Sequence, residues 1–430
     1  MSPRFTRRTL RTATAATLAA SLLGISPALA QDTDTDTTAG GSSSSSGKSG
    51  ATGSPGLDSF LRSLVVNSSQ SSVATSGSSL EALLSSLRLA GSSEFRLSSD
   101  LVSVNPGYPK PIDESITTAE VISRVPESDR VERWTIASPA MARNVEVQVM
   151  LPTDASTPAP MLYLLDGVEA GRVSEWLGPG EAETFFADEN VTLVMPTEAM
   201  ASMYSDWIAD DPVLGQNMWE TFITEELAPL LEAEEDLNFN GRRGIGGLSM
   251  GATGAVHLAN TNPDMFDGVF GISGCYSTMS NVGRQTAHIT VASRGGTLEN
   301  MWGPFGSEQW LRHDVSRNPE GLRNMAVYLS AANGEYNFDP DFDYTDVPPS
   351  TITTGILLEQ GAYLCTQELD EAMTDAGMNH QVIEYTGPGV HKWSTFQPQI
   401  QPLIALPRIA PKGSTASMPS ARYRLMGERI

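Results

Sequence analysis

From about residue 130 onward, the chain alternates short apolar runs with longer amphipathic segments. Two segments with alternating polar and apolar residues, 131–137 and 145–150, predict a pair of antiparallel strands. Six short apolar runs then predict buried strands at 161–165, 191–195, 243–246, 268–272, 326–329 and 381–385. Helix-length segments stand at 219–233, 252–259 and 362–376. This alternation predicts an α/β fold with a mostly parallel central sheet covered by helices on both faces.

The first thirty residues have the pattern of an export signal. Four arginines precede an apolar run at 15–25, and Ala28-Leu29-Ala30 fits a small-residue cleavage site near Ala30. The pair Arg7-Arg8 leaves both the general and the twin-arginine export routes open. No later segment reaches the roughly 18 apolar residues of a membrane helix. We therefore predict a secreted, cell-envelope protein whose mature chain has no transmembrane anchor.

Composition divides the rest of the chain. Residues 31–95 are rich in Ser, Gly, Asp and Thr, which predicts a disordered spacer after the signal peptide of residues 1–30. Residues 96–130 form an N-terminal extension, and 131–407 are the predicted catalytic domain. The basic, polar residues 408–430 are the predicted C-terminal tail. The role of the segment before residue 131 stays open.

The net charge of the chain limits which partners it can bind. The formal net charge is −24, and removing the arginine-rich signal peptide makes it more negative. Such a surface repels phosphates, so a nucleic-acid partner is not expected.

The chain has two cysteines, Cys275 and Cys365. In an exported protein two cysteines can form a disulfide, which we predict here, the alternative being two separate buried thiols.

One pentapeptide, Gly247-Leu248-Ser249-Met250-Gly251, matches the pattern Gly-x-Ser-x-Gly. The match alone is weak in a chain with 38 glycines. However, a predicted strand precedes it and a small-residue helix follows, which is the setting of a nucleophile elbow. Ser249 is therefore the predicted nucleophile, and the N–H of Met250 a predicted oxyanion donor. The alternative is an ordinary glycine-rich turn.

A serine nucleophile needs a base, and the chain has five histidines. In a fold with this elbow the base follows the last strand. His257 lies on the same predicted helix as the nucleophile and cannot fold back onto it. His288 and His313 precede the late strands, and His380 begins the last one. His391 follows that strand in a Gly/Pro-rich loop and is the predicted base.

The pattern alone does not identify the acid. Most hydrolases of this fold place it just after the penultimate strand, which favours Glu335 or Asp339 here. Three further acidic residues follow in the same segment: Asp341, Asp343 and Asp346. The second oxyanion donor is expected after the first central strand, from the N–H of either Gly167 or Val168.

Taken together, these residues resemble the antigen 85 family, the mycolyltransferases of mycobacteria and corynebacteria. The resemblance runs from about residue 131 to 402 and implies the α/β-hydrolase fold. It rests on six motifs in the same order: Tyr163-Leu164-Leu165-Asp166-Gly167, Met203-Tyr204-Ser205-Asp206-Trp207, Gly247-Leu248-Ser249-Met250-Gly251, Met301-Trp302-Gly303-Pro304, Leu357-Leu358-Glu359 and His391-Lys392-Trp393.

The resemblance implies a different acid. The family's acid is a Glu in a Phe/Leu-Leu-Glu motif 32 residues before the catalytic histidine, and Glu359 stands 32 residues before His391. Glu359 thus replaces Glu335 and Asp339 as the first choice. The family also implies Val168 and Met250 as the oxyanion donors.

The resemblance further implies contacts with the substrate, from Asp166, Arg172, Asp206, Trp207 and Trp393. This sequence departs from the family at two places. Glu169 stands where the family often has an arginine that contacts the sugar, and the free cysteine of the family has no counterpart. If Cys275 and Cys365 pair, the bridge would fix the segment that carries the acid.

The implied reaction is acyl transfer through a Ser249 acyl-enzyme, from trehalose monomycolate to a hydroxyl of another trehalose monomycolate or of arabinogalactan. Trehalose mycolates and envelope glycans are the expected partners, and no cofactor or metal is expected. One alternative is a secreted carboxylesterase of the esterase D type, which uses the same triad with water as the acceptor. Another is a non-catalytic envelope or matrix-binding protein that retains the fold.

Overall fold

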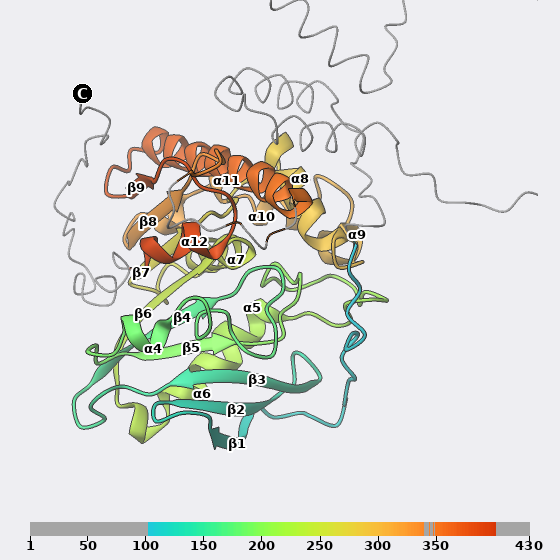
Figure 1. The fold of residues 1–430 in the computed structure, drawn as a ribbon. Helices are drawn as coiled ribbons and strands as arrows, with labels where there is room; N and C mark the ends of the chain where they lie inside the picture. The colour runs from blue at the N-terminus through green and yellow to red at the C-terminus, as the bar shows by residue number, and fades with distance from the viewer. Residues whose placement is uncertain (1–101, 339–343, 345–346, 348, 401–430) are drawn as a thin grey trace, which may run out of the picture. The chain divides into compact units, whose positions relative to one another are not determined.

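The computed structural model describes residues 102–338, 344, 347 and 349–400. The predicted signal peptide, the spacer and the C-terminal tail lie outside the described residues. Within them, one nine-stranded sheet has the order β1-β2-β3-β5-β4-β6-β7-β8-β9 (Figure 1). The first three strands pair antiparallel with their neighbours, and β3 also pairs antiparallel with β5. From β5 to β9 every pairing is parallel, so the predicted α/β fold class is confirmed.

The eight predicted strands are all present, with bounds that shift by a few residues. They are β2 (Val131–Ser138), β3 (Arg143–Met150), β4 (Ala159–Leu165), β5 (Thr192–Pro196), β6 (Phe239–Leu248), β7 (Gly268–Ile272), β8 (Ala326–Ala331) and β9 (Val382–Tyr385). The sequence pattern does not predict β1 (Glu120–Pro126), an edge strand whose side chains are all exposed or half-buried. An edge strand buries little on either face, so it lacks the apolar run that marks a central strand.

Successive residues of a strand point to opposite faces of the sheet, and here both faces are buried. In β4, Met161 and Tyr163 belong to one apolar cluster, whereas Leu162 and Leu164 belong to another. The first cluster packs under α7 (Met250–Thr261) and the C-terminal half of α11 (Pro349–Asp375). The second packs under α4 (Ala182–Phe185) and α12 (Trp393–Phe396).

The remaining helices are short. They are α5 (Trp219–Thr221), α6 (Ala228–Glu232), α8 (Asn281–Ala292), α9 (Leu298–Trp302) and α10 (Glu308–Arg312). The predicted helix at 219–233 contains a π-helical segment, Phe222–Leu227, between α5 and α6. The predicted helix at 362–376 begins earlier, at Pro349, where the first turn tolerates a proline because its N–H would have no helical partner. None of the described helices is long and apolar enough to span a bilayer.

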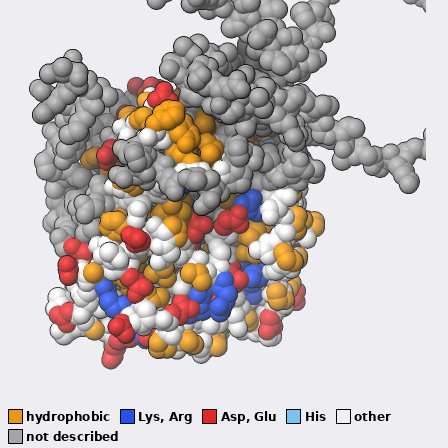
Figure 2. Space-filling model, viewed as in Figure 1, with side chains coloured by type: hydrophobic (Ala, Val, Ile, Leu, Met, Phe, Trp, Pro, Cys, Tyr) orange, Lys and Arg blue, Asp and Glu red, His pale blue; other side chains and the backbone are white. Residues whose placement is uncertain are grey.

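The net negative charge does not form one continuous patch on the face seen in Figure 2. Basic and acidic side chains intermingle there over the antiparallel strands. Arg133 in β2 is buried and pairs with Glu127 at 2.6 Å and with Glu146 at 3.1 Å. These ion pairs lie at the antiparallel strands of the sheet.

Gly246 provides a test of how tightly the sheet packs on the face covered by α4 and α12. A Cβ added to it would lie 2.1 Å from the ring of Phe270 on the next strand, so Gly246→Ala must displace that ring. We expect a loss of about 1–3 kcal/mol in the free energy of unfolding, measured by denaturant titration. Gly178→Ala is the control, since its Cβ would make only ordinary contact, at 3.9 Å from the Glu175 carbonyl oxygen. Equal unfolding midpoints for the two variants would show that the packing is looser than described.

Candidate active site

Ser249 lies at the sharp turn between β6 and α7, with φ at 54° and ψ at −121°. The turn is crowded by backbone on both sides. A Cβ on Gly247 would lie 2.4 Å from the Gly251 carbonyl carbon, and one on Gly251 would lie 2.2 Å from the Leu165 carbonyl oxygen. Both glycines are therefore required by the close approach of three backbone segments. The strained serine is held by its own N–H, which donates to Ile272 O at 2.8 Å.

Three side chains from distant parts of the chain form one line of hydrogen bonds. The Oγ of Ser249 lies 2.7 Å from Nε2 of His391, and Nδ1 of His391 lies 2.7 Å from Oε2 of Glu359. A carboxylate at Nδ1 fixes the ring so that Nε2 can accept the serine proton. The geometry is that of a nucleophile, a base and an orienting acid.

Glu359 is fully buried, and both of its oxygens have partners. While Oε2 faces the histidine, Oε1 accepts from the Ser273 hydroxyl at 2.6 Å and from the Ala332 N–H at 2.8 Å. These donors make up for the water that the buried carboxylate has lost. Sequence reasoning missed both donors. Ser273 directly follows β7 and Ala332 directly follows β8, so their place at the ends of neighbouring parallel strands is the signal that could have found them.

Helix α11 positions the predicted base as well as the predicted acid. One turn before Glu359, the carbonyl oxygen of Gly355 accepts from the His391 N–H at 3.0 Å. On its other side the His391 ring meets the edge of Phe396, with centroids 5.0 Å apart. The histidine is thus fixed by its backbone, its Nδ1 and its ring.

Of the acids expected from the pattern alone, only Glu335 lies among the described residues, and it pairs with a residue other than His391. Glu335 is exposed, and its Oε2 accepts from Asn333 Nδ2 at 3.0 Å. The other four, Asp339, Asp341, Asp343 and Asp346, lie outside the described residues. Among the other histidines, His380 contacts the carbonyl oxygen of Leu322 at 3.1 Å. His257 and His313 face Glu220 in a separate cluster, which is also the group of described residues that could hold a metal ion.

The predicted oxyanion residues flank the nucleophile. Met250 is the first residue of α7, where a backbone N–H has no helical acceptor. On the other side, a Cβ on Gly167 would lie 3.7 Å from the Ser249 Cβ, so the segment that leads to Val168 passes directly beside the serine. This placement suits two N–H donors aimed at a developing oxyanion.

Asp166 directly follows β4 and is fully buried beside the elbow. Its Oδ1 accepts from Ser174 Oγ and from the Glu175 N–H, each at 3.1 Å, whereas Oδ2 has no hydrogen-bond partner. Burial raises the pKa of the Asp166 carboxyl to about 8, against the lowering effect of the Ser174 hydrogen bond. A neutral acid with one free oxygen can both donate and accept a hydrogen bond.

The other predicted substrate contacts divide into two groups. Trp393 follows the base by two residues, and its Nε1 donates to Glu175 Oε2 at 2.7 Å. By contrast, Asp206 accepts from Thr221 Oγ1 at 2.6 Å in the first turn of α5, and Trp207 is a buried core residue.

The side chains of Arg172 and Glu169 also form ion pairs within the chain. Arg172 pairs with Glu146 at 2.9 Å at an exposed position. Glu169, which stands where the family often has an arginine, pairs with Arg294.

The structure contains the predicted disulfide between Cys275 and Cys365. Cys275 follows β7, and Cys365 lies in α11 six residues after Glu359. The bridge therefore joins the segment beside the elbow to the helix that carries the acid.

Comparison with known proteins finds similarity to esterases and acyltransferases. Residues 138–405 match the profile of a family described as "Putative esterase". Two similar proteins are named diacylglycerol acyltransferase/mycolyltransferase. Ag85A of Mycobacterium leprae is 27% identical over 63% of this chain and 80% of its own length. Ag85B of Mycolicibacterium smegmatis is 28% identical over 64% of this chain and 83% of its own. The resemblance to the antigen 85 family is confirmed.

Solved structures agree on the fold. MPT51 (FbpC1) of Mycobacterium tuberculosis has a TM-score of 0.52 at 21% identity, with 67% of this chain and 97% of that chain covered. An S-formylglutathione hydrolase from Agrobacterium tumefaciens has a TM-score of 0.50 at 17% identity, with 67% and 99% covered. Both comparisons support the α/β-hydrolase fold.

The assignment of the acid can be tested by the rate at which Ser249 reacts with a fluorophosphonate probe. Glu359→Gln should slow labelling by about 10²-fold or more, because the base loses the carboxylate that orients it. The matched control is Glu335→Gln, which removes an exposed carboxylate near the end of β8 and should label at the rate of the unchanged protein. The opposite ranking of the two variants would identify Glu335 as the acid.

The raised pKa of Asp166 predicts a pH-dependent stability. The carboxyl stays neutral in the folded chain up to about pH 8, whereas it ionises near pH 3.9 when unfolded. Its contribution to stability is thus fully present below about pH 4 and is lost as the pH rises to about 8. Asp166→Asn cannot ionise, so its free energy of unfolding should gain on the wild-type value between those limits. Asp129→Asn, at an exposed position, is the control, and parallel pH profiles for all three proteins would contradict the prediction.

Proposed function

This chain belongs to the putative esterase family, and from that premise we propose that it is a secreted acyltransferase acting on mycolates. It moves a mycolyl chain from trehalose monomycolate to a sugar hydroxyl, through an acyl-enzyme on Ser249. The observation that carries the proposal is the line of hydrogen bonds from Glu359 through His391 to Ser249. The similarity to proteins named mycolyltransferases supports the choice of acyl group.

The first half of the proposed reaction forms the acyl-enzyme. Nε2 of His391 takes the proton of Ser249 as the oxygen attacks the ester carbonyl, and Glu359 stabilises the imidazolium. The N–H groups of Val168 and Met250 then stabilise the oxyanion of the tetrahedral intermediate. His391 returns the proton to the trehalose oxygen, and trehalose leaves.

The second half reverses these roles. A hydroxyl of a second trehalose monomycolate, or of arabinogalactan, loses its proton to His391 and attacks the acyl-enzyme. Transfer must exceed hydrolysis, which favours a site with little water. The full burial of Glu359 and the 12% exposure of the His391 side chain agree with that need.

Two residues are proposed to contact the sugar. Asp166 lies beside the elbow with one carboxyl oxygen free, and Trp393 lies two residues beyond the base. A neutral Asp166 suits a sugar hydroxyl, which both donates and accepts. Arg172, Asp206 and Trp207 stay predicted substrate contacts, and in the structure they pair with Glu146, Thr221 and Ser202 respectively.

The proposed location is the cell envelope. The predicted signal peptide and the disulfide both suit an oxidising, exported compartment. In this proposal the chain consists of the spacer 31–95, the extension 96–130, the catalytic domain 131–407 and the tail 408–430. Residues 120–126 of the extension add the edge strand β1 to the sheet, which suggests that the folded domain starts before residue 131.

The experiment is product analysis with purified protein and trehalose monomycolate. We expect trehalose dimycolate, and we expect its formation to fall by about 10³-fold or more in His391→Gln, which lacks the base. The matched control is His380→Gln, which should keep the activity of the unchanged protein because His380 contacts the Leu322 carbonyl away from the triad. Free mycolate without dimycolate would favour the carboxylesterase. A protein that gives neither product and does not react with a fluorophosphonate would be a non-catalytic member of the fold.

A further inference from the structure

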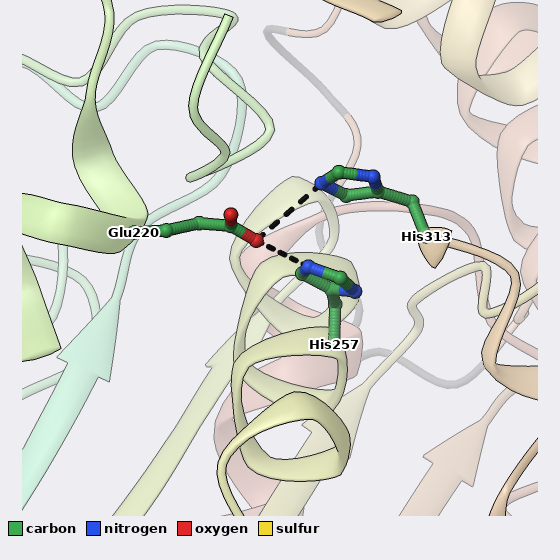
Figure 3. Close-up of side chains that lie close together, drawn as sticks. All are labelled: Glu220, His257 and His313. Atoms are coloured by element: carbon green, nitrogen blue, oxygen red, sulfur yellow. Dashed lines mark hydrogen bonds and ion pairs between the residues drawn. The ribbon is translucent and has the colours of Figure 1, made fainter. Parts of the chain in front are cut away.

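A second cluster of polar side chains lies away from the triad, near the C-terminal half of helix α7. It consists of Glu220 in α5, His257 in α7 and His313 directly after α10 (Figure 3). One ligand atom from each lies within 4.8 Å of the others, and all three side chains are buried. His257 is eight residues beyond Ser249, about 12 Å along the helix, so the cluster is not part of the triad.

The ring of His313 is oriented as a ligand. Its Nδ1 lies 2.7 Å from the carbonyl oxygen of Gln309, which can only accept, so Nδ1 carries the proton. In the neutral ring Nε2 then has a free lone pair. This Nε2 makes no hydrogen bond and is paired only with Glu220 Oε1, at 3.4 Å, at a residue that is 4% exposed. Histidines that bind metals usually donate their other ring N–H in this way.

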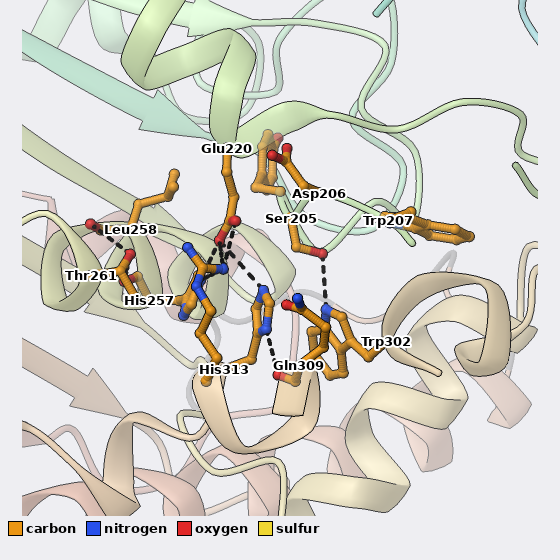
Figure 4. Close-up of polar contacts among 12 residues, drawn as sticks. Ser205, Asp206, Trp207, Glu220, His257, Leu258, Thr261, Trp302, Gln309 and His313 are labelled. Atoms are coloured by element: carbon orange, nitrogen blue, oxygen red, sulfur yellow. Dashed lines mark hydrogen bonds and ion pairs between the residues drawn. The ribbon is translucent and has the colours of Figure 1, made fainter. Parts of the chain in front are cut away.

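Its neighbours fix the rest of the cluster. Nε2 of His257 contacts Oε1 of Glu220, and the two imidazoles stack with centroids 4.0 Å apart. Trp302 stacks on the other side of His313 at 4.6 Å (Figure 4).

One cation already lies against the carboxylate. Nη1 of Arg312 donates to both oxygens of Glu220, at 3.0 Å and 2.7 Å, and lies 3.5 Å from His257 Nε2. A metal ion on these ligands would have to displace this guanidinium. The side chain of Arg312 is 40% exposed, so it can turn outward into solvent. It also marks the direction from which an ion can enter.

We propose that Glu220, His257 and His313 form a binding site for Zn²⁺, in which Arg312 is the competing internal cation. Two imidazoles and one carboxylate are a ligand set that zinc uses, with bonds of about 2.0–2.2 Å. Water would fill the fourth position. The bound ion would join α5, the helix of the elbow and the end of α10, and so would stabilise the fold without taking part in acyl transfer.

The test measures zinc uptake by the purified full-length protein, by dialysis against ZnCl₂ and elemental analysis. We expect one zinc per chain in the wild type and at least about a tenfold loss of affinity in His257→Leu and His313→Asn. Arg312→Gln keeps both imidazoles and removes the competing cation, so its affinity should rise about tenfold or more. Zinc should also raise the melting temperature in the same order, since a ligand of the folded state stabilises it. His380→Asn is the matched control and should bind like the wild type.

The proposal is overturned if the wild type takes up no more zinc than His257→Leu and His313→Asn. Circular dichroism decides whether these two variants are folded. Should either fail to fold, the comparison passes to Arg312→Gln, and equal zinc affinity in that variant and the wild type overturns the proposal. None of these measurements uses an acyl substrate, so the result is independent of the proposed function.

Discussion

The close approach of three backbone segments at the elbow sets the conditions for the rest of the site. Neither Gly247 nor Gly251 has room for a Cβ, because the turn presses against the end of β4. The same contact that forces Ser249 into a positive φ brings the segment after Leu165 beside it. The nucleophile and its predicted oxyanion donors are therefore positioned by one packing constraint, and a looser turn would lose both together.

The acid and the base depend on a second constraint, which is the placement of helix α11. Glu359 lies within this helix, and the Gly355 carbonyl one turn earlier holds the backbone of His391. Two sets of contacts hold the helix in place. Ser273 and Ala332 donate hydrogen bonds to Glu359, and a disulfide joins Cys365 to Cys275. A rigid acid held within such a helix needs no reorganisation during proton transfer.

The buried strands could be predicted because each is a short apolar run, and the elbow could be predicted because its sequence pattern is local. The edge strand β1 could not be predicted, since it buries too few side chains to give a regular pattern of apolar residues. The position of Glu359 could not be derived from the pattern, because nothing in a helical segment distinguishes a buried acid from an exposed one, and only the family resemblance pointed to it. Ser273 and the pairing of Arg172 with Glu146 depend on contacts between distant parts of the chain.

The location of Glu359 also bears on how this fold can vary. Since the carboxylate is carried by α11, the segment that joins β8 to α11 has no catalytic group assigned to it, and insertions there need not move the triad. The triad can therefore keep its place while chains of this fold differ in sequence between Ala332 and Pro349.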